Sequence, residues 1–408
     1  MTASLILFYS IAVLNIIAGI SKKHVKLFYG LALAVIFLFM TFNCAGPDIS
    51  GYMSAYDQWI NSEGVIVHKG HMEWGYMMLM SVCRRIGLDF FSFRIILSLL
   101  CLGLMVSTIN YYKVNPNFVV GLYMTYLFFF DTIQLRNCVA EFILLFATRY
   151  LFKKSFLATV KYIILVLLAW GFHTIALFSL LLLLFKISDK KIYYRCITVL
   201  SVLMFAVCVI LQPVLPQIAN WLLQFITRGS SYLEINVEIG YLVILILQLV
   251  GFIPLYLCRR AVKNNKAVRK NVDNIFKINI ILFLFMPLMF INSNFYRIYR
   301  NYILLTIIGL TLIYGNSKAR TSSGGFAAIA LLLLNIGWFI RDMIIKNDIK
   351  VIINPIFDGN IITNFTQTVN AGEWIAVAAV AVVVFAIFRF LYTEHTKRLR
   401  VSRVGKIR

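Results

Sequence analysis

The sequence predicts an all-α, polytopic membrane protein, and three observations lead to this fold class. Of its 408 residues, 61% are hydrophobic, and the mean hydropathy is +0.85, far above the values of soluble domains. The apolar residues come in runs of nearly bilayer-spanning length, and Lys and Arg gather in alternate connections between them. Because helices satisfy their own backbone polar groups in lipid, we expect about 13 transmembrane helices plus an interfacial helix. They would form one integral membrane domain over residues 1–408.

Thirteen apolar runs are the candidate spans. Several are shorter than the roughly 20 residues that a hydrocarbon core of about 30 Å requires, and we interpret these as spans buried among neighbours or ending at a polar cavity. The first run has no leading positive charge, so we interpret it as a span and not as a cleaved signal. The runs lie at 3–19, 25–44, 90–110, 118–131, 136–152, 156–171, 173–186, 193–211, 236–258, 275–291, 296–314, 325–341 and 373–391.

One more helix-like run, 72–87, is polar at both ends and carries Arg84 and Arg85. We interpret it as interfacial or re-entrant. If it were a full span, Lys153, Lys154 and the basic loop 259–270 would move to the outer side, which contradicts the positive-inside rule.

The distribution of charge then sets the topology. With the N-terminus outside and the C-terminus inside, the inner segments carry 28 Lys and Arg against three acidic residues, and the remainder carries 11 against 13. The outer loops are 45–89, 212–235 and 342–372, and residues 392–408 form a cytoplasmic tail. The net charge of +23 is thus explained by a lipid bilayer as partner, and no support for nucleic acid remains.

Several classes of site are not expected. The seven cysteines lie in or beside apolar runs and include no CxxC, which favours small core residues over disulfides or zinc. No metal-ligand spacing is evident, and no GxGxxG, P-loop or DxD motif occurs, so we predict no metal and no cofactor. Since the longest inner loop has only about sixteen residues, chemistry is expected at the outer face, in the longer loops.

Unusual polar residues collect at that outer face. Two arginines one helical turn apart attract an anion, and guanidinium groups suit phosphate. A lipid-linked pyrophosphate would need such a cluster beside an apolar groove, and sugar transfer from it would need a carboxylate or histidine as general base. The candidates are Asp48, Glu73, Arg84, Arg94, Asp131, Gln134, Arg136, Asn137, His173, Arg297, Arg300 and Asn301.

Most of these residues also have a purely structural explanation. Asp48 is placed to cap a helix, and His173 to donate to a carbonyl. Glu73 and Arg84 share a helical face and would form an ion pair, while Asp131 and Arg136 would form another. Arg84 and Arg85 would reach lipid headgroups. Arg297 and Arg300 are harder to explain this way, because ionisable residues in a span cost several kcal/mol unless they face a partner or a cavity.

The chain also resembles a known family. Five segments carry the resemblance in order and with similar spacing, and together they cover most of residues 45–315: "PDISGYMSAYDQ", "EWGYMMLM", "LRNCVAEFILLF", "GFHTIALFSLLLLL" and "FYRIYRNYILL". They are similar to the EpsG-type branch of the Wzy class of O-antigen and capsular polysaccharide polymerases. The resemblance implies a GT-C-like integral membrane glycosyltransferase of the bacterial inner membrane. It points to Asp48, Tyr52, Glu73, Gly75, Tyr76, Arg136, His173 and Arg297.

We therefore expect a repeat-unit polymerase that transfers a growing glycan from undecaprenyl pyrophosphate to a lipid-linked repeat unit at the periplasmic face. A chain-length regulator would be a further partner. The pyrophosphate-binding residues would be Arg297, Arg300, Arg136 and Arg84, with Tyr52 and Tyr76 in the substrate site. The base is left open among three residues, with Glu73 slightly favoured over Asp48 and His173 because its helix also carries arginines.

Two other classes of protein are considered. The first is a glycosyltransferase that uses a polyprenyl-phosphate sugar, or an O-antigen ligase; a monophosphate donor needs fewer arginines. The second is a lipid-linked glycan flippase, which should show charges at mid-membrane depth, internal repeats or matched broken helices. No repeat is evident, and only Pro254 and Pro287 interrupt the spans.

Overall fold

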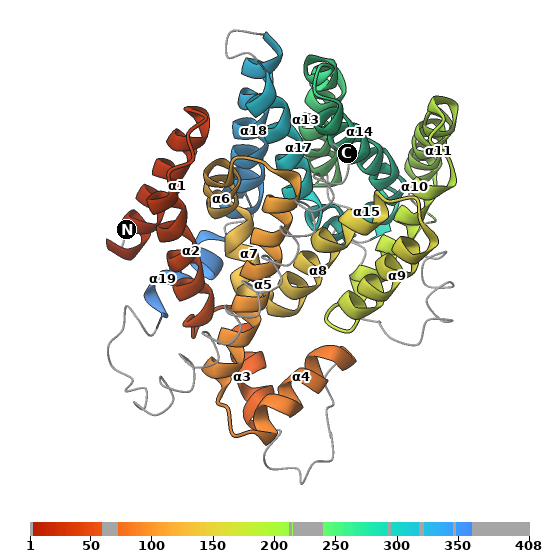
Figure 1. Cartoon of the computed structure of the whole chain (residues 1–408). Coiled ribbons are helices and arrows are strands. Elements are labelled where there is room, and N and C mark those ends of the chain that lie inside the picture. The colour runs from red at the N-terminus through yellow and green to blue at the C-terminus, as the bar shows by residue number, and fades with distance from the viewer. Residues whose placement is uncertain are drawn as a thin grey trace, which may run out of the picture.

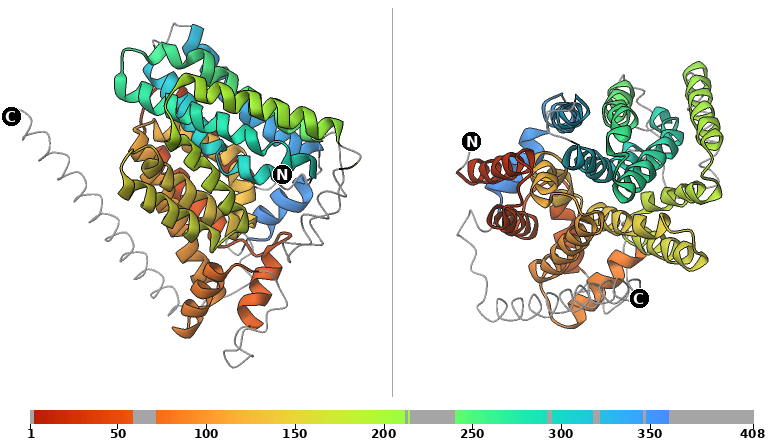
Figure 2. Two further views of the ribbon diagram at one scale, coloured as in Figure 1. Left: turned by 90° about the vertical axis from the view of Figure 1, so that its right-hand side faces the viewer. Right: turned by 45° about the horizontal axis from the view of Figure 1, so that its top comes forward.

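The computed structural model describes residues 3–58, 72–211, 214, 240–291, 295–317, 322–345 and 348–360. Every named element in these ranges is a helix, and the strand-like pairing found there is one isolated antiparallel bridge between Asn43 and Asn360. The helices form a bundle, with α3 and α4 at its lower end in Figure 1 and in the left view of Figure 2. The predicted all-α class is confirmed for this part of the chain.

The first half of the bundle is built from helices whose starts are fixed by capping residues. The side chains of Asp89, Asn115 and Ser155 each accept a backbone N–H of the following turn, which satisfies a donor that the helix leaves unpaired. The elements are α1 (Ala3–Ile20), α2 (Lys26–Thr41), α3 (Ile49–Gln58), α4 (Trp74–Arg85), α5 (Phe90–Tyr112), α6 (Pro116–Thr125), α7 (Leu127–Ile133), α8 (Leu135–Leu151), α9 (Phe156–Trp170), the 3-10 helix η1 (Thr174–Leu183) and α10 (Leu184–Ile187).

The second half contains more irregular turns. A proline lies inside α13, and two π-helical segments follow α18. The elements are α11 (Lys191–Ile210), α13 (Gly240–Cys258), η3 (Arg259–Val262), α14 (Lys266–Leu282), η4 (Phe283–Phe285), α15 (Leu288–Ile291), α16 (Tyr296–Arg300), α17 (Ile303–Asn316), α18 (Ser322–Phe339), η6 (Ile340–Ile345), η7 (Ile349–Ile353) and α19 (Asn354–Asp358).

The structure does not confirm the number of spans that the sequence pattern predicts. Within the described ranges, five helices are long and apolar enough to cross a membrane: 90–112, 191–210, 242–262, 296–316 and 323–345. Four more apolar helices are shorter, at 4–20, 26–41, 156–170 and 174–187. The predicted run 118–131 is broken at Tyr126, between α6 and α7. The predicted span 373–391 lies outside the described residues, so the count of thirteen is not confirmed.

The centre of the bundle is formed by α6, α7, α8 and α17, whose side chains are almost all buried. By contrast, only 17% of α11 is buried, and large apolar side chains cover its outer surface. A helix of this composition with apolar residues facing outward is expected in contact with lipid. The bundle is thus an inner group of helices surrounded by lipid-facing ones.

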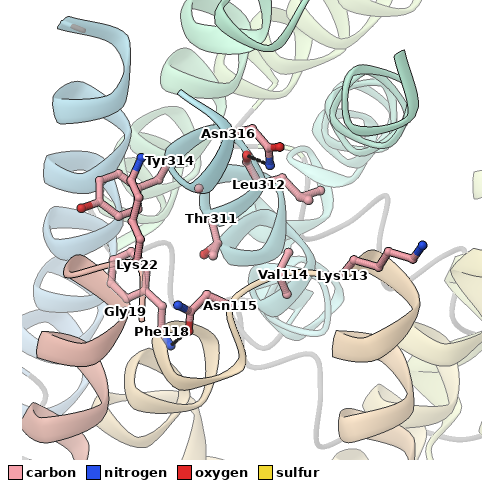
Figure 3. Close-up of a pocket in the computed structure, with 11 residues that line it drawn as sticks. Gly19, Lys22, Lys113, Val114, Asn115, Phe118, Thr311, Leu312, Tyr314 and Asn316 are labelled. Atoms are coloured by element: carbon pink, nitrogen blue, oxygen red, sulfur yellow. Dashed lines mark hydrogen bonds between the residues drawn. The ribbon is translucent and has the colours of Figure 1, made fainter. Parts of the chain in front are cut away.

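The basic turns that the sequence assigns to the inner side contact one another. Lys22 donates to the carbonyl of Ser317 at 2.7 Å and lies over the ring of Tyr314, beside a cavity of about 200 Å³ between α1, α6 and α17 (Figure 3). Asn265 in the η3–α14 turn donates to Asn316 at the end of α17, at 3.3 Å. These turns therefore share one end of the bundle, as the predicted alternation requires.

At the opposite end, Arg94 holds three elements together. This arginine of α5 is fully buried, and its guanidinium donates to the carbonyls of Met40, Asn43 and Thr132. These carbonyls lie near the ends of α2 and α7. Arg94 therefore connects α2, α5 and α7 where the loop that precedes α3 begins, and it is a structural residue rather than a ligand-binding one.

Candidate functional site

The site is organised by the docking of α4 on the turn between α9 and η1. The backbone N–H of Tyr76 donates to the carbonyl of Gly171 at 2.9 Å. A Cβ atom on Gly75 would lie 2.8 Å from that same carbonyl oxygen, so only glycine permits this approach. The contact places Glu73, the residue before α4, against the turn that contains His173.

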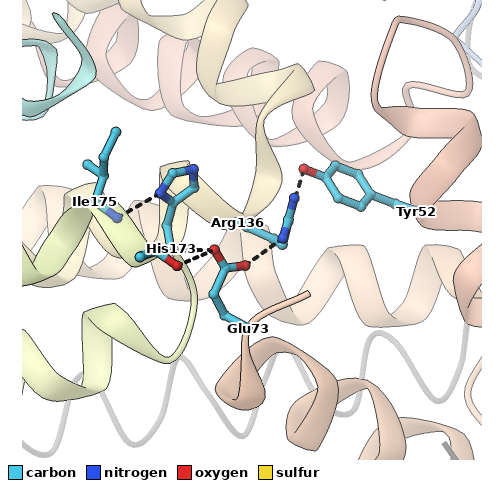
Figure 4. A network of polar contacts seen from close by, with 6 residues as sticks. Tyr52, Glu73, Arg136, His173 and Ile175 are labelled. Carbon is cyan, nitrogen blue, oxygen red and sulfur yellow. Dashed lines mark hydrogen bonds and ion pairs between the residues drawn. The ribbon is translucent and has the colours of Figure 1, made fainter. Parts of the chain in front are cut away.

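Glu73 connects this turn to α8. One carboxylate oxygen accepts from the Arg136 guanidinium at 2.5 Å, and the side chains of Glu73 and Arg136 are only 13% and 22% exposed. The other oxygen accepts from the backbone N–H of Thr174 at 3.0 Å and from its hydroxyl at 3.2 Å (Figure 4). Both oxygens therefore face donors, which fixes the carboxylate and holds Arg136 in place.

Arg136 also reaches α3. Its Nε donates to the Tyr52 hydroxyl at 3.4 Å, and its guanidinium lies 5.5 Å from the centre of the Tyr52 ring. The rings of Tyr52 and Tyr76 are 5.7 Å apart. Burial raises the pKa of Tyr52, Arg136 opposes that shift, and the charges of Asp48 and Glu73 add to it. The structure thus brings Tyr52, Tyr76, Glu73 and Arg136 together.

His173 lies on the other side of Glu73 (Figure 4). Its Nδ1 accepts the backbone N–H of Ile175 at 3.2 Å, so the neutral ring carries its proton on Nε2. Burial, and then the charges of Arg297, Arg136 and Arg300, lower the pKa of His173 to about 3. At neutral pH His173 is therefore a neutral hydrogen-bond donor among three arginines, and it is poorly suited to accept a proton.

The two arginines of α16 differ in their environment. Arg300 is fully buried and donates to the Gln134 side chain at 2.5 Å and to the Tyr296 hydroxyl at 3.4 Å. Arg297 is partly exposed, and its charge acts on His173. Asn137 donates to Asn301 at 3.1 Å and joins α8 to the end of α16. Arg297 is therefore the accessible member of the pair, while Arg300 fixes α16 against the link between α7 and α8.

The remaining predicted residues lie differently. Asp48 is exposed immediately before α3, and within the described part of the chain no donor contacts its carboxylate. Arg84 does not pair with Glu73; it lies 5.3 Å from the centre of the Tyr56 ring, because α4 carries it a further three turns from the site. Arg136 does not pair with Asp131, which instead accepts from the Tyr123 hydroxyl at 3.0 Å.

Some residues that shape the site were not singled out from the sequence. Gly171 acts through its backbone, and Thr174 acts through both its backbone N–H and its hydroxyl. In the sequence, only the tripeptides "WGY" and "GFH" indicate a close approach there. Glu141 of α8 is fully buried, like Asp131, and the charges of both act on Arg300. The sequence does contain a signal for Glu141, because a carboxylate in the middle of an apolar run is costly unless it faces a partner or a cavity.

The comparisons with known proteins identify a family for the chain. The model of the EpsG family matches residues 3–356, which contain every residue of the site. No curated protein and no solved structure matches the chain.

Proposed function

We propose that this chain, which belongs to the EpsG family, is a polysaccharide repeat-unit polymerase. It would transfer a growing glycan from undecaprenyl pyrophosphate to the terminal hydroxyl of a lipid-linked repeat unit at the periplasmic face. The observation that carries the proposal is the arrangement of Arg136, Arg297 and His173 about the turn between α9 and η1. Family membership supports a polymerase-like membrane protein, and the reaction and substrate are our inference.

In this proposal the leaving pyrophosphate is bound by Arg136 and Arg297. Both guanidinium groups act on His173, so an anion beside the Nε2–H of His173 meets two permanent charges and one neutral donor. Such an arrangement stabilises the charge that develops on the pyrophosphate as the glycosidic bond breaks. Arg300 is a positioning residue, because its guanidinium is buried against Gln134 and Tyr296.

The acceptor hydroxyl needs a base, and the contacts of the three candidates separate them. Glu73 uses both oxygens on Arg136 and Thr174, and His173 uses Nδ1 on Ile175. Asp48 is an exposed carboxylate on the same side, close enough to act on Tyr52. We therefore propose Asp48 as the base and Glu73 as the residue that positions Arg136, which reverses the slight preference drawn from the sequence.

The wider setting is also part of the proposal. We place about thirteen spans in a GT-C-like bundle in the bacterial inner membrane, with the N-terminus outside and the C-terminus inside. The contacts among the basic turns support the alternation of the described helices. A chain-length regulator remains a proposed partner.

The test is complementation of a deletion strain, read as the length of surface glycan. The wild-type gene should restore a ladder, and the empty strain should display single repeat units. Absence of glycan would instead indicate a flippase or a ligase. Arg297→Ala should give single units, and Arg297→Lys should be strongly impaired because a lysine lacks the planar fork. Arg195→Ala, an exposed arginine of α11, is the control.

The base is tested on purified lipid-linked repeat units. Asp48→Asn should lower the polymerisation rate by about 10²–10⁴-fold, the usual contribution of a positioned base. Asp57→Asn removes an exposed carboxylate from α3, the helix that follows Asp48, and should retain the wild-type rate. Equal rates for both variants and the wild type would eliminate Asp48 as the base.

A further inference from the structure

A second, larger cavity lies at the end of the bundle that carries the basic turns. Its volume is about 1310 Å³, and it is enclosed by the turn between α8 and α9, the turn between α10 and α11, and the first half of α14. Eight basic side chains and two carboxylates line it, a formal excess of six positive charges. They are Lys153, Lys154, Lys186, Lys263, Lys266, Arg269, Lys270, Lys277, Asp189 and Asp273.

Part of this charge is balanced within the protein. Asp189 pairs with Lys154 and with Lys277, the latter at 3.1 Å, and these contacts hold its pKa below the usual range. Arg269 and Asp273 pair at 3.5 Å along α14. Both carboxylates that line the cavity are thus paired with basic side chains of the protein.

The rest of the charge has no acidic counterpart among the described residues. Lys263, Lys266 and Lys270 are exposed at the start of α14, and all three line the cavity. The positive-inside rule accounts for basic residues in each connection, but it does not require several connections to converge on one cavity. Like charges that converge repel one another, and a bound anion relieves that repulsion.

The cavity also has an apolar rim, which indicates the kind of anion. Phe156 and Ile187 line it and are 84% and 68% exposed. Each stands at the end of an apolar helix that packs in the bundle, α9 or α10. Basic side chains beside exposed apolar ones suit an amphiphile, with phosphate against the lysines and acyl chains along Phe156 and Ile187.

We propose that this cavity binds the headgroup of an anionic membrane phospholipid, with a two-phosphate lipid fitting its charge best. Lys263, Lys266 and Lys270 contact the phosphates, while Asp189 holds Lys154 and Lys277 as the fixed wall. This site is separate from the proposed catalytic one and does not depend on the polymerase reaction. Its occupant comes from the leaflet that faces the basic turns.

The experiment is a titration of the purified full-length protein, in phosphatidylcholine nanodiscs, with diphosphatidylglycerol, read by native mass spectrometry. Lys266→Gln combined with Lys270→Gln should weaken binding about 30-fold, since each lysine near an anionic surface contributes about 1 kcal/mol. Lys190→Gln combined with Lys191→Gln is the control, because it removes the same charge from exposed residues that do not line the cavity.

Each result decides the proposal. Weakening confined to the cavity variant supports it. Equal weakening in both double variants, or in neither, overturns it in favour of a diffuse basic surface. Displacement of the lipid by inorganic pyrophosphate at equal concentration would assign the cavity to a soluble polyphosphate and overturn the lipid as occupant. Normal thermal unfolding midpoints for both variants show that folding is intact, because all four lysines are exposed.

Discussion

The contact between Glu73 and Arg136 allows the proposed division of roles to be measured. Glu73→Gln removes the charge while keeping the size of the side chain. Both Glu73 oxygens accept from donors, whereas glutamine has one oxygen and one NH₂ group. In either orientation, the amide therefore turns a donor against Arg136 or against Thr174. The variant should release Arg136 from its position.

The expected magnitude follows from the kind of bond that is lost. A hydrogen bond between charged groups contributes about 1.5–3 kcal/mol. Screening by solvent, which weakens exposed ion pairs, is small here because the side chains of Glu73 and Arg136 are only 13% and 22% exposed. If Glu73 acts only through Arg136, Glu73→Gln should lower kcat/KM about 10- to 150-fold. The same substitution in an Arg136→Gln background should then cost less than about threefold.

The assay is polymerisation of purified lipid-linked repeat units by the four proteins of this double-mutant cycle, across pH. The acidic limb of the pH–rate profile should persist in Glu73→Gln and disappear in Asp48→Asn, since only a base produces it. A loss beyond about 10³-fold in both backgrounds, together with loss of the acidic limb, would make Glu73 the base and refute its positioning role.

Four further predictions concern the framework around the site. Arg94→Met leaves the carbonyls of Met40, Asn43 and Thr132 without their donor. It should lower the free energy of unfolding by about 2 kcal/mol or more, which is measured as a lower thermal unfolding midpoint. The control Arg85→Met, at the exposed end of α4, should leave the midpoint unchanged. Gly75→Ala places a Cβ 2.8 Å from the Gly171 oxygen and should lower the polymerisation rate at least about tenfold, whereas Gly51→Ala meets nothing within 4 Å and should retain it. Because the folded pKa of His173 is about 3 and an unfolded histidine titrates near 6.5, its neutral form stabilises the protein above pH ~6.5, and this contribution is lost as the pH falls toward 3. His173→Gln should therefore reduce the dependence of the thermal unfolding midpoint on pH between about pH 6.5 and 4. If the slope of midpoint against pH is unchanged in this variant, the pH dependence belongs to another group. In intact cells, a cysteine at Asn265 should resist an impermeant maleimide while one at position 230 reacts, and labelling at Asn265 would overturn the outer-face assignment.

The sequence predicts the class of fold well, because hydropathy and charge report directly on the membrane. The bounds of the spans are harder to predict, since an apolar run does not reveal where its helix breaks. The backbone at Tyr126 leaves helical geometry and divides one predicted span into α6 and α7. The run 173–186 begins as a 3-10 helix, which no periodicity in its leucine-rich sequence indicates.

For the candidate site, the sequence proposes residues but does not predict which of them pair. Helical spacing placed Glu73 and Arg84 on one face, yet the docking of Gly75 on Gly171 turned Glu73 toward Arg136 of α8. That contact joins residues 63 positions apart, and no local pattern encodes it. The same limit left the base open, because the choice depends on which oxygens already meet donors.

The arginines show how position, and not residue type, decides the role. Arg94 and Arg300 are both fully buried, and each is surrounded by acceptors of the protein itself, carbonyls for one and Gln134 and Tyr296 for the other. Arg136 and Arg297 keep some exposure beside His173, whose pKa is lowered first by burial and then by these charges. Under the proposed function, a pyrophosphate entering here would meet the guanidinium groups of Arg136, which Glu73 holds in place, and of Arg297. We propose that the buried arginines set the geometry and that the partly exposed ones bind the substrate.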